Sequence, residues 1–412
     1  MLSEAIPVLT IAIVGKTNVG KTTLFNAATL LNAEISNYPF TTKEPNAGTA
    51  YVSDICVCKE LGVKDNPQDS ACIDGWRYSP IRMLDIPGLI KDAWMGRGLG
   101  NKFLSVIGQA DGIIHVVDAS GSVDAEGKIA QPGSGNPVQD VLDIEMEMER
   151  WLAEIIIHNK PLIEKGASET SLAEAMSQTL SGVKARPAHV TLALERSGLA
   201  DRPFERWGKE RMMRFAADLL PVMKPIMIIA NKMDIHSAEE NFNMLTDYFS
   251  ERIVLACSAE AELALRRAER LGLLQYTPGH EKFNILDGAK LTPEQRRALD
   301  YVEQKVFAKW MRTGIQQALN TMVFKLLKTN MVYPVANEQA YADTHGNVLP
   351  HVHLMPDGAT PMDLAKEVHT RLAENYVLAI DAKTGIRLPK DYRLRHRDVV
   401  KIMTQPRAKP KK

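Results

Sequence analysis

A short stretch near the N-terminus, GKTNVGKTT at residues 15–23, has the residue types and spacing needed to bind phosphate groups. It matches the P-loop pattern G-x-x-x-x-G-K-[ST] at Gly15, Gly20, Lys21 and Thr22. Glycines let backbone N–H groups converge on phosphate oxygens, and the helix that follows points its positive end at them. The candidate nucleotide-binding residues here are Gly15, Lys16, Thr17, Asn18, Val19, Gly20, Lys21, Thr22 and Thr23.

A second motif, D-x-x-G at Asp85–Gly88, follows the apolar run 81–86. We expect Lys21 to approach the outer phosphates, Thr22 to ligate Mg²⁺, Asp85 to hold Mg²⁺ through water, and the Gly88 amide to bond the γ-phosphate. The loop 37–42, NYPFTT, offers Thr41 and Thr42 as Mg²⁺ and γ-phosphate sensors, and the pattern alone does not choose between them. The alternatives are an ordinary polar turn and a glycine-rich loop without a switching role.

A third motif, N-K-x-D at Asn231–Asp234, ends the apolar run 225–230. The Asp234 carboxylate can accept two hydrogen bonds from guanine, whereas adenine lacks both donors and would leave the carboxylate unpaired. Asn231 is expected to brace the loop, and the stem of Lys232 to lie over the base. A backbone amide at Ser258 or Ala259, after the run 253–256, is expected to reach the guanine O6 atom.

Apolar runs precede these motifs, as expected for buried parallel strands, and they predict a doubly wound α/β sheet. We expect strands at 11–14, 49–58, 81–86, 113–118, 225–230 and 253–256, a polar excursion at 59–79 and a helix at 24–31. His115, inside one strand, is interpreted as a core histidine. Helical spacing from 138 to about 220 predicts a helical insertion, and residues 260–328 look mostly helical.

The C-terminal segment predicts a small α+β module, with strands at 331–335, 348–355, 376–380 and 399–403 and a helix at 360–373 capped by Thr360. Residues 331–381 carry two basic and seven acidic side chains, whereas residues 382–412 carry eleven basic and two acidic ones. This asymmetry predicts contact with phosphate backbones, and the alternative is a solvated basic face. The predicted divisions are 1–135 and 221–328 for the nucleotide-binding domain, 136–220 for the insertion, 329–405 for the C-terminal domain and 406–412 for a basic tail.

Bulk composition narrows the class of protein. The 412 residues carry 50 basic and 50 acidic side chains, so total charge predicts no partner. No run is long enough to span a bilayer and residues 1–14 do not resemble a signal peptide, so we expect a cytoplasmic protein. Cys56, Cys58 and Cys72 suggest either reduced thiols or a metal or redox site, but the sequence shows no fourth metal ligand.

Together the motifs resemble the Obg family of TRAFAC-class GTPases, in its archaeal YchF type. The resemblance rests on NYPFTT, DIPGLI with GRGLGNKFL, NKMD, and HVHLMPDGATPMDLA with HRDVVKI. It implies a helical insertion, a β-grasp TGS domain at the C-terminus, ribosome or RNA association, and Thr42 as the switch threonine. Many YchF proteins lack this lysine, have Glu in place of Asp234 and use ATP. Leu89 occupies the position of the water-orienting glutamine of Ras-like enzymes, and residues 116–157 contain no histidine to replace it.

We therefore expect a monomeric, Mg²⁺-dependent GTP-binding protein that hydrolyses GTP slowly and acts as a switch on ribosomes or RNA. The candidate catalytic residues are Lys21, Thr42, Asp85, Gly88 and Asn18, and the candidate metal ligands are Thr22, Thr42 and Asp85. Asn18 either ligates a K⁺ ion beside the phosphates or stabilises the turn of the loop. The rival functions are a non-enzymatic ribosome- or RNA-binding adaptor stabilised by nucleotide, and an ATPase.

Overall fold

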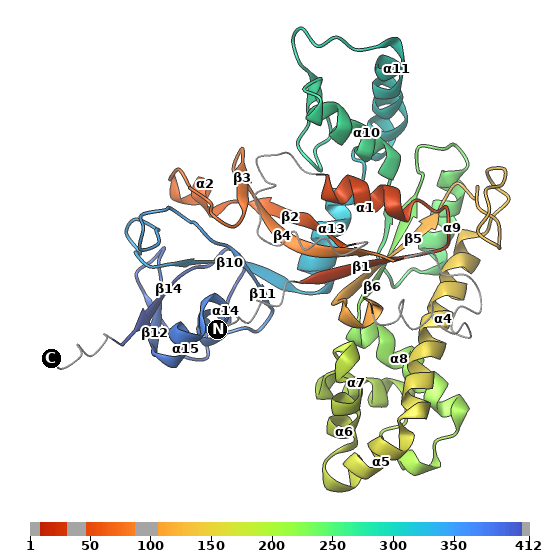
Figure 1. Cartoon of the computed structure of the whole chain (residues 1–412), viewed down its shortest axis with the longest axis vertical. Helices are drawn as coiled ribbons and strands as arrows, with labels where there is room; N and C mark the ends of the chain where they lie inside the picture. The colour runs from red at the N-terminus through yellow and green to blue at the C-terminus, as the bar shows by residue number, and fades with distance from the viewer. Residues whose placement is uncertain (1–8, 31–46, 87–105, 406–412) are drawn as a thin grey trace.

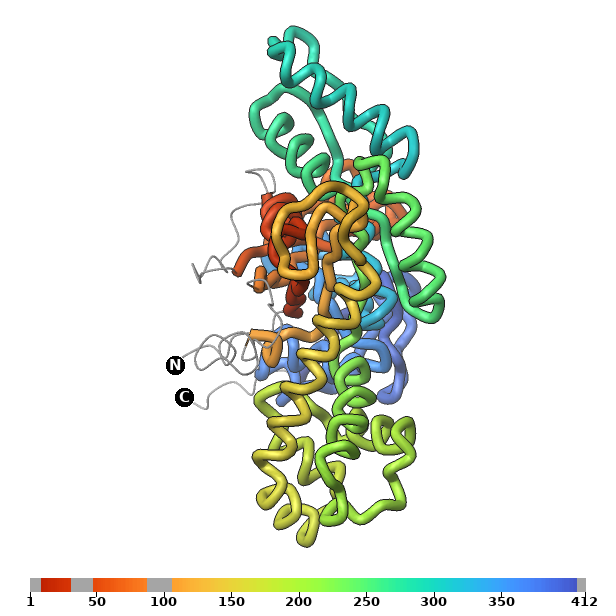
Figure 2. Tube along the Cα trace, turned by 90° about the vertical axis from the view of Figure 1, so that its right-hand side faces the viewer, coloured from red at the N-terminus to blue at the C-terminus, as the bar shows by residue number. Residues whose placement is uncertain are grey.

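A central seven-stranded sheet organises the protein. The computed structural model describes residues 9–30, 47–86 and 106–405. A helical insertion and a smaller lobe bearing α10 and α11 lie at opposite ends of the long axis, and a second sheet near the C-terminus lies to one side of the first (Figures 1 and 2). The predicted α/β fold with a helical insertion and a C-terminal α+β domain is confirmed.

The strand order of the central sheet is β2-β4-β1-β5-β6-β7, with β3 paired to β4. Neighbours from β4 to β7 run parallel, and β2 runs antiparallel to β4. The strands are β1 (Thr10–Val14), β2 (Ala47–Ile55), β3 (Ala71–Ile73), β4 (Trp76–Asp85), β5 (Gly112–Asp118), β6 (Ile226–Asn231) and β7 (Val254–Ala256). The parallel strands β1 and β5 are buried along their whole length, which explains their continuous apolar sequences.

Alternate side chains of β1 face two different cores. Ile11 and Ile13 pack with α1 (Lys21–Thr29) and α13 (Ile315–Asn320) on one face. Ala12 and Val14 contribute to a core shared with the helical insertion on the other. This two-residue period is the geometry of a strand buried on both faces.

The insertion consists of helices joined by short irregular segments, as predicted. Its helices are α4 (Pro137–His158), α5 (Lys160–Glu169), α6 (Leu172–Thr179), α7 (Pro187–Ser197) and α8 (Lys209–Met223). Asn136 caps α4 by accepting a hydrogen bond from the Gln139 backbone, and Ser171 and Glu174 form a capping box on α6. The buried residues Trp207 and Phe215 lie 5.3 Å apart between ring centroids in its core.

The lobe between β7 and the C-terminal domain contains α10 (Ala259–Arg270) and α11 (Pro293–Val302), followed by α12 (Ala308–Trp310). It also contains a small hairpin of β8 (Leu274–Gln275) and β9 (Asn284–Ile285), which the sequence analysis missed. Two-residue strands are too short to show any hydrophobic periodicity. The helix α9 (Ala238–Tyr248) connects β6 to β7 and so precedes this lobe in the sequence.

The C-terminal sheet has the order β11-β10-β14-β12-β13. Its strands are β10 (Thr329–Val335), β11 (His353–Pro356), β12 (Tyr376–Asp381), β13 (Arg387–Leu388) and β14 (Val399–Thr404). The helix predicted at 360–373 is instead two, α14 (Pro361–Val368) and α15 (Thr370–Glu374). His369 is extended and its ring Nδ1 accepts a hydrogen bond from the Arg371 backbone, so it ends one helix and caps the next.

The polar excursion predicted at 59–79 is more ordered than expected. It contains the short helix α2 (Val57–Leu61) and β3, and β4 already begins at Trp76. The predicted strand 49–58 ends at Ile55, because residues 47–55 pair with 76–84 as a long antiparallel hairpin that terminates there. Antiparallel pairing is long-range information that a local polar composition does not reveal.

Candidate nucleotide-binding site

The P-loop connects β1 to α1, as its motif requires. Gly15 and Gly20 have φ angles of 147° and 97°, which residues other than glycine rarely adopt. A Cβ atom on Gly15 would lie 2.2 Å from the Val116 carbonyl oxygen, and one on Gly20 would lie 2.2 Å from the Asn231 amide. Both glycines are therefore fixed by close contacts with the ends of β5 and β6.

Lys21, Thr22 and Asp85 lie together at the start of α1. The Thr22 hydroxyl donates a 2.8 Å hydrogen bond to Asp85 Oδ2, and Lys21 Nζ donates to the Lys16 carbonyl oxygen. Burial lowers the pKa of Lys21 to about 8, although the Asp85 charge opposes this shift. Burial likewise raises the pKa of Asp85. Asp85 Oδ1 is buried without a hydrogen-bond partner among the described residues, so these oxygens fit a hard cation such as Mg²⁺.

Asn231 connects three segments of the site. Its side-chain amide donates to the Val19 carbonyl oxygen at 2.9 Å, and its Oδ1 atom accepts from the Ala259 backbone at 3.0 Å. The predicted bracing function has a direct geometrical basis, because one side chain joins the P-loop, β6 and the start of α10.

The sequence analysis missed Asp118, the last residue of β5. It is paired in register with Asn231, and its carboxylate accepts a 2.9 Å bond from Lys232 Nζ. The same carboxylate accepts bonds from the backbone and hydroxyl groups of Ser120 and Ser122. Lys232 itself has a φ angle of 65°, so the N-K-x-D turn is held in a specific shape by Asp118. The sequence did offer one signal for Asp118, because this aspartate is the last residue of a buried apolar strand.

The amides at residues 258 and 259, which are predicted to reach the guanine O6 atom, both have protein acceptors in this structure. The Ser258 N–H donates to the Thr313 carbonyl oxygen at 2.8 Å, and the Ala259 N–H donates to Asn231 Oδ1 at 3.0 Å. Each therefore has a protein acceptor. Contact with a guanine O6 would require either amide to share or exchange that bond.

Asp234, the proposed base-reading carboxylate, is partly buried. The Tyr301 hydroxyl, from α11, donates to the Asp234 carbonyl oxygen at 3.0 Å, and the neighbouring Met233 carbonyl accepts from the Trp310 indole at 3.0 Å. The lobe after β7 therefore supports the N-K-x-D turn. Tyr301 and Asp234 are 67 residues apart in the sequence, so no local pattern predicts their contact.

A loop at residues 119–136 contacts the P-loop through the Gly127 carbonyl. Thr17 Oγ1 and Asn18 Nδ2 both donate to the Gly127 carbonyl oxygen, at 2.8 and 2.9 Å. Lys16 Nζ forms a buried 2.6 Å ion pair with Asp140 of α4. Asn18 has a φ angle of 62°, so it stabilises a left-handed turn, while its amide nitrogen rather than its oxygen binds this loop.

The structure describes some of the remaining predicted residues and leaves others outside the described ranges. Thr41, Thr42, Gly88 and Leu89 lie outside the described residues. Val19, Thr23 and Gly20 lie on the P-loop and the first turn of α1, where the motif places them. His115 is fully buried, 3.5 Å from Glu145, as expected for a core residue.

Comparison with known families matches three parts of the chain. Residues 10–163 match the 50S ribosome-binding GTPase family, and residues 229–337 match the Obg-like GTPase YGR210-like, G4 motif-containing domain. Residues 345–404 match the TGS domain. The last match covers β11 to β14 of the C-terminal sheet, and the second includes β10 and the N-K-x-D turn.

Two relatives match this chain over most of their own length. An uncharacterized GTP-binding protein of Methanocaldococcus jannaschii is 42% identical, over 96% of this chain and 98% of that protein. The ribosome-binding ATPase YchF of Mycoplasma genitalium is 32% identical, over 65% of this chain and 72% of that protein. The chain belongs to the Obg-like, YchF-type family of P-loop GTPases.

Solved structures agree with this family. A GTP-binding protein from Pyrococcus horikoshii OT3 is 34% identical and superposes with a TM-score of 0.77, over 96% of this chain and 100% of that one. The YchF GTPase of Schizosaccharomyces pombe, at 16% identity and a TM-score of 0.55, shares the fold. Among the described residues, every helix is too short or too polar to span a membrane.

Proposed function

We propose that this YchF-type protein binds GTP with Mg²⁺, hydrolyses it slowly to GDP and phosphate, and acts as a cytoplasmic, monomeric switch on ribosomes or RNA. The observation that carries the proposal is the way Asn231 links the base motif to the P-loop and to the start of α10. One edge of the sheet thus brings together the candidate phosphate-binding and base-reading groups, which supports the proposal because nucleotides bind at this edge in open α/β sheets.

Magnesium has a suitable set of donors in this proposal. Thr22 and Asp85 are already in contact, and Thr42 and Gly88 belong to the proposed switch segments. Bound Mg²⁺ would neutralise charge on the phosphates. Lys21 would hold its ammonium group against the outer phosphate oxygens, and its phosphate contacts would replace the bond to the Lys16 carbonyl.

Guanine is the proposed base because Asp234 is an acceptor for its two donors. Relatives named ribosome-binding ATPase make adenine the competing candidate. The Asp118 carboxylate holds the Lys232 ammonium and so keeps the N-K-x-D turn in place for either base. The absence of a glutamine at position 89 is the reason for proposing slow intrinsic hydrolysis.

A turnover assay tests this function. Phosphate release from GTP and from ATP is measured with purified full-length protein, with and without ribosomes. GTP turnover that ribosomes stimulate supports the proposed switch. Nucleotide binding without turnover under either condition supports the adaptor, and ATP turnover without GTP turnover supports the ATPase.

The TGS domain is the proposed contact with ribosomes or RNA, but deleting it is an unsuitable test. Met331, Tyr333 and Val399 of this domain belong to the same buried core as Ile11 and Ile81 of the central sheet. Removing residues 329–412 would expose that core. Point substitutions on the surface give a cleaner test.

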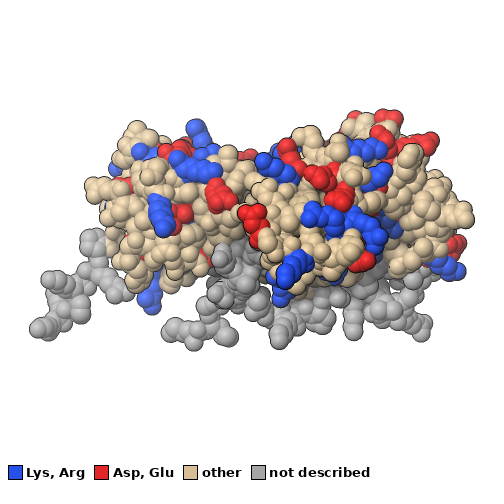
Figure 3. All heavy atoms as spheres, turned by 90° about the horizontal axis from the view of Figure 1, so that it is seen from above, with Lys and Arg blue, Asp and Glu red and all other residues tan. Residues whose placement is uncertain are grey.

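The predicted basic patch is only partly available for such a contact. Lys383 and Arg397 form ion pairs with Glu60 of α2, both at 2.8 Å, and Lys401 pairs with Glu338. The first two hold the pKa of Glu60 below its ordinary value. Arg387 and Lys390 are exposed, and residues 406–412 lie outside the described part of the chain. Basic and acidic groups are interspersed on the face seen from the α10 and α11 end (Figure 3).

Reversing both exposed charges should therefore weaken ribosome or RNA binding. For Arg387→Glu with Lys390→Glu, we expect roughly tenfold or greater loss in affinity, and a shallower dependence of binding on salt, by about 0.7–0.9 per lost phosphate contact in the logarithmic slope. Co-sedimentation with ribosomes across a salt series measures both effects. The double variant Lys290→Glu with Arg297→Glu, on the α11 lobe, is the matched control. Equal losses in the two double variants would contradict a specific contact through the TGS domain.

Potassium is a further proposed cofactor. The Asn18 amide nitrogen is bonded to Gly127, which leaves its Oδ1 atom as the group that would ligate K⁺ beside the phosphates. We expect faster GTP hydrolysis in K⁺ than in Na⁺ at equal ionic strength, and loss of that difference in Asn18→Ala, because a bound cation offsets charge in the transition state. Identical rates in both salts would leave Asn18 with its turn-stabilising role alone.

A further inference from the structure

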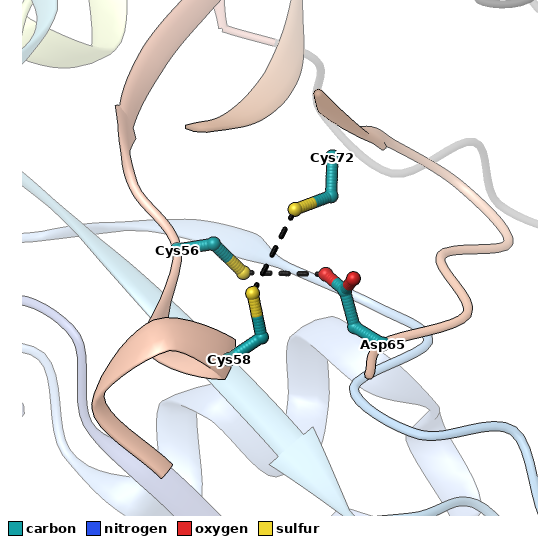
Figure 4. Close-up of side chains that lie close together, drawn as sticks. All are labelled: Cys56, Cys58, Asp65 and Cys72. Carbon is teal, nitrogen blue, oxygen red and sulfur yellow. Dashed lines mark hydrogen bonds between the residues drawn. The ribbon is translucent and has the colours of Figure 1, made fainter. Parts of the chain in front are cut away.

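Three of the four cysteines converge with an acidic side chain at the end of the β2–β4 hairpin. Cys56 follows β2, Cys58 lies on α2, Cys72 lies on β3, and Asp65 lies on the loop between α2 and β3 (Figure 4). Their Sγ atoms and one carboxylate oxygen all lie within 4.8 Å of one another. Asp65 is the fourth donor that the sequence analysis did not find.

Two distances within this cluster match those around a shared tetrahedral cation. The Cys58 and Cys72 sulfur atoms are 3.8 Å apart, and Cys56 Sγ lies 3.3 Å from Asp65 Oδ2. With Zn–S bonds of about 2.3 Å, two sulfur ligands of a tetrahedron lie about 3.8 Å apart. A disulfide would require about 2.05 Å, so the Cys58–Cys72 separation is nearly twice too long for one.

The surroundings also suit a thiolate-rich metal site. Cys56 and Cys58 are buried, and Cys72 is partly buried. Three thiolates and one carboxylate around a divalent ion would leave two uncompensated negative charges. Arg77, fully buried on β4, offsets one of them, with Nη2 3.0 Å from Asp65 Oδ2. Its Nη1 atom donates to Ser70 Oγ at 2.7 Å, which fixes the guanidinium. Such outer contacts orient the ligands of metal sites.

The segment that contains this cluster, residues 56–75, also contacts the TGS domain. The backbone N–H groups of Asn66 and Gln68 donate to the carbonyl oxygens of Val348 and Pro350, both at 2.8 Å. Arg77 Nη2 also donates to the Leu349 carbonyl at 2.8 Å, and its guanidinium lies 5.4 Å from the centre of the Tyr333 ring. Whatever holds residues 56–75 in shape therefore also holds the surface on which the TGS domain packs.

We propose that Cys56, Cys58, Asp65 and Cys72 bind one Zn²⁺ ion, which fastens residues 56–75 as the docking surface of the TGS domain. Three thiolates and one carboxylate form a closed four-ligand site, which is the arrangement of structural zinc. Soft sulfur donors select zinc over the Mg²⁺ of the nucleotide site. Because the ligands come from four short local elements, metal binding adds directly to the stability of this segment.

Metal analysis of the full-length protein tests the proposal. After expression with zinc and dialysis against a chelator, we expect about one zinc per chain in the wild type. Cys72→Ser should lose the retained zinc, and Asp65→Asn should bind it at least about tenfold more weakly. Cys257→Ala is the matched control, because Cys257 is a buried thiol outside the cluster, and it should keep the metal.

Cobalt substitution gives a readout that needs no variant. Co²⁺ added to the metal-free wild type should produce the visible bands and sulfur-to-cobalt charge transfer of tetrahedral thiolate ligation, and stoichiometric Zn²⁺ should abolish them. Wild-type protein that retains no zinc and gives no such spectrum would overturn the proposal. A thiol count that reveals a Cys58–Cys72 disulfide in place of metal would overturn it as well.

Limited proteolysis tests the docking role. Removing zinc from the wild type should increase cleavage within residues 59–75 at least severalfold, and restoring zinc should reverse the change. Reversal by zinc separates docking from irreversible unfolding. Cleavage that is the same with and without zinc would show that the ion does not hold this surface.

Discussion

Lys21→Ala should reduce GTP turnover by at least about 10²–10³-fold, because it removes a preorganised positive charge from the phosphates. The Lys21 side chain is buried near Asp85, and it is the lysine of the G-K-[ST] part of the P-loop motif. Phosphate release at saturating GTP with Mg²⁺ measures the effect. Turnover should fall to a comparable extent in Thr22→Ala, which loses the hydroxyl bonded to Asp85.

Two further variants make this result specific. Lys290→Ala, an exposed lysine of the α11 lobe, should retain wild-type turnover. Leu89→Gln need not raise turnover, because a glutamine helps only when the surrounding switch segment positions it. Normal GTP hydrolysis by Lys21→Ala would mean that the activity belongs to another site or to a contaminant.

The second large effect concerns the base. Wild-type protein should bind GTP about 10²-fold or more tightly than ATP, because adenine leaves the Asp234 carboxylate without two charge-assisted hydrogen bonds. Asp234→Asn and Asp234→Glu should each weaken GTP binding by a similar factor. Competition of unlabelled GTP and ATP against a fluorescent GTP analogue measures the preference.

Xanthosine triphosphate separates a lost contact from a damaged fold. Xanthine carries a carbonyl where guanine has its amino group, so the amide of Asp234→Asn can donate where the carboxylate accepted. That variant should bind xanthosine triphosphate more tightly than GTP. Equal affinity of the wild type for GTP and ATP would instead favour the ATPase named among the relatives.

Much of the site was present in the sequence because its motifs are local. The P-loop, D-x-x-G and N-K-x-D patterns each combine a buried strand with the turn that follows it. Parallel strands end at the same edge of a sheet, so the order of the motifs already predicts that they meet there. The Asn231 contacts to Val19 and Ala259 have the geometry that such a meeting requires.

Contacts between distant segments were decided only by the tertiary structure. Asp118 ends a strand like many other aspartates, and only its pairing with β6 places it beside Lys232. The amides at residues 258 and 259 donate to Thr313 and Asn231, two acceptors that local sequence does not reveal. Tyr301 reaches the N-K-x-D turn across 67 residues for the same reason.

The C-terminal half shows the same division. Strand-like runs and the Thr360 cap predicted an α+β module, and composition predicted its basic end, yet neither could show that Lys383 and Arg397 pair with Glu60. The three cysteines were visible in the sequence, whereas Asp65 became their neighbour only because α2, β3 and the loop between them fold back on the β2–β4 hairpin. Sequence determined which chemical groups this protein carries near each strand end. Tertiary packing decided which of them are already bonded to protein, because that depends on segments far apart in the chain.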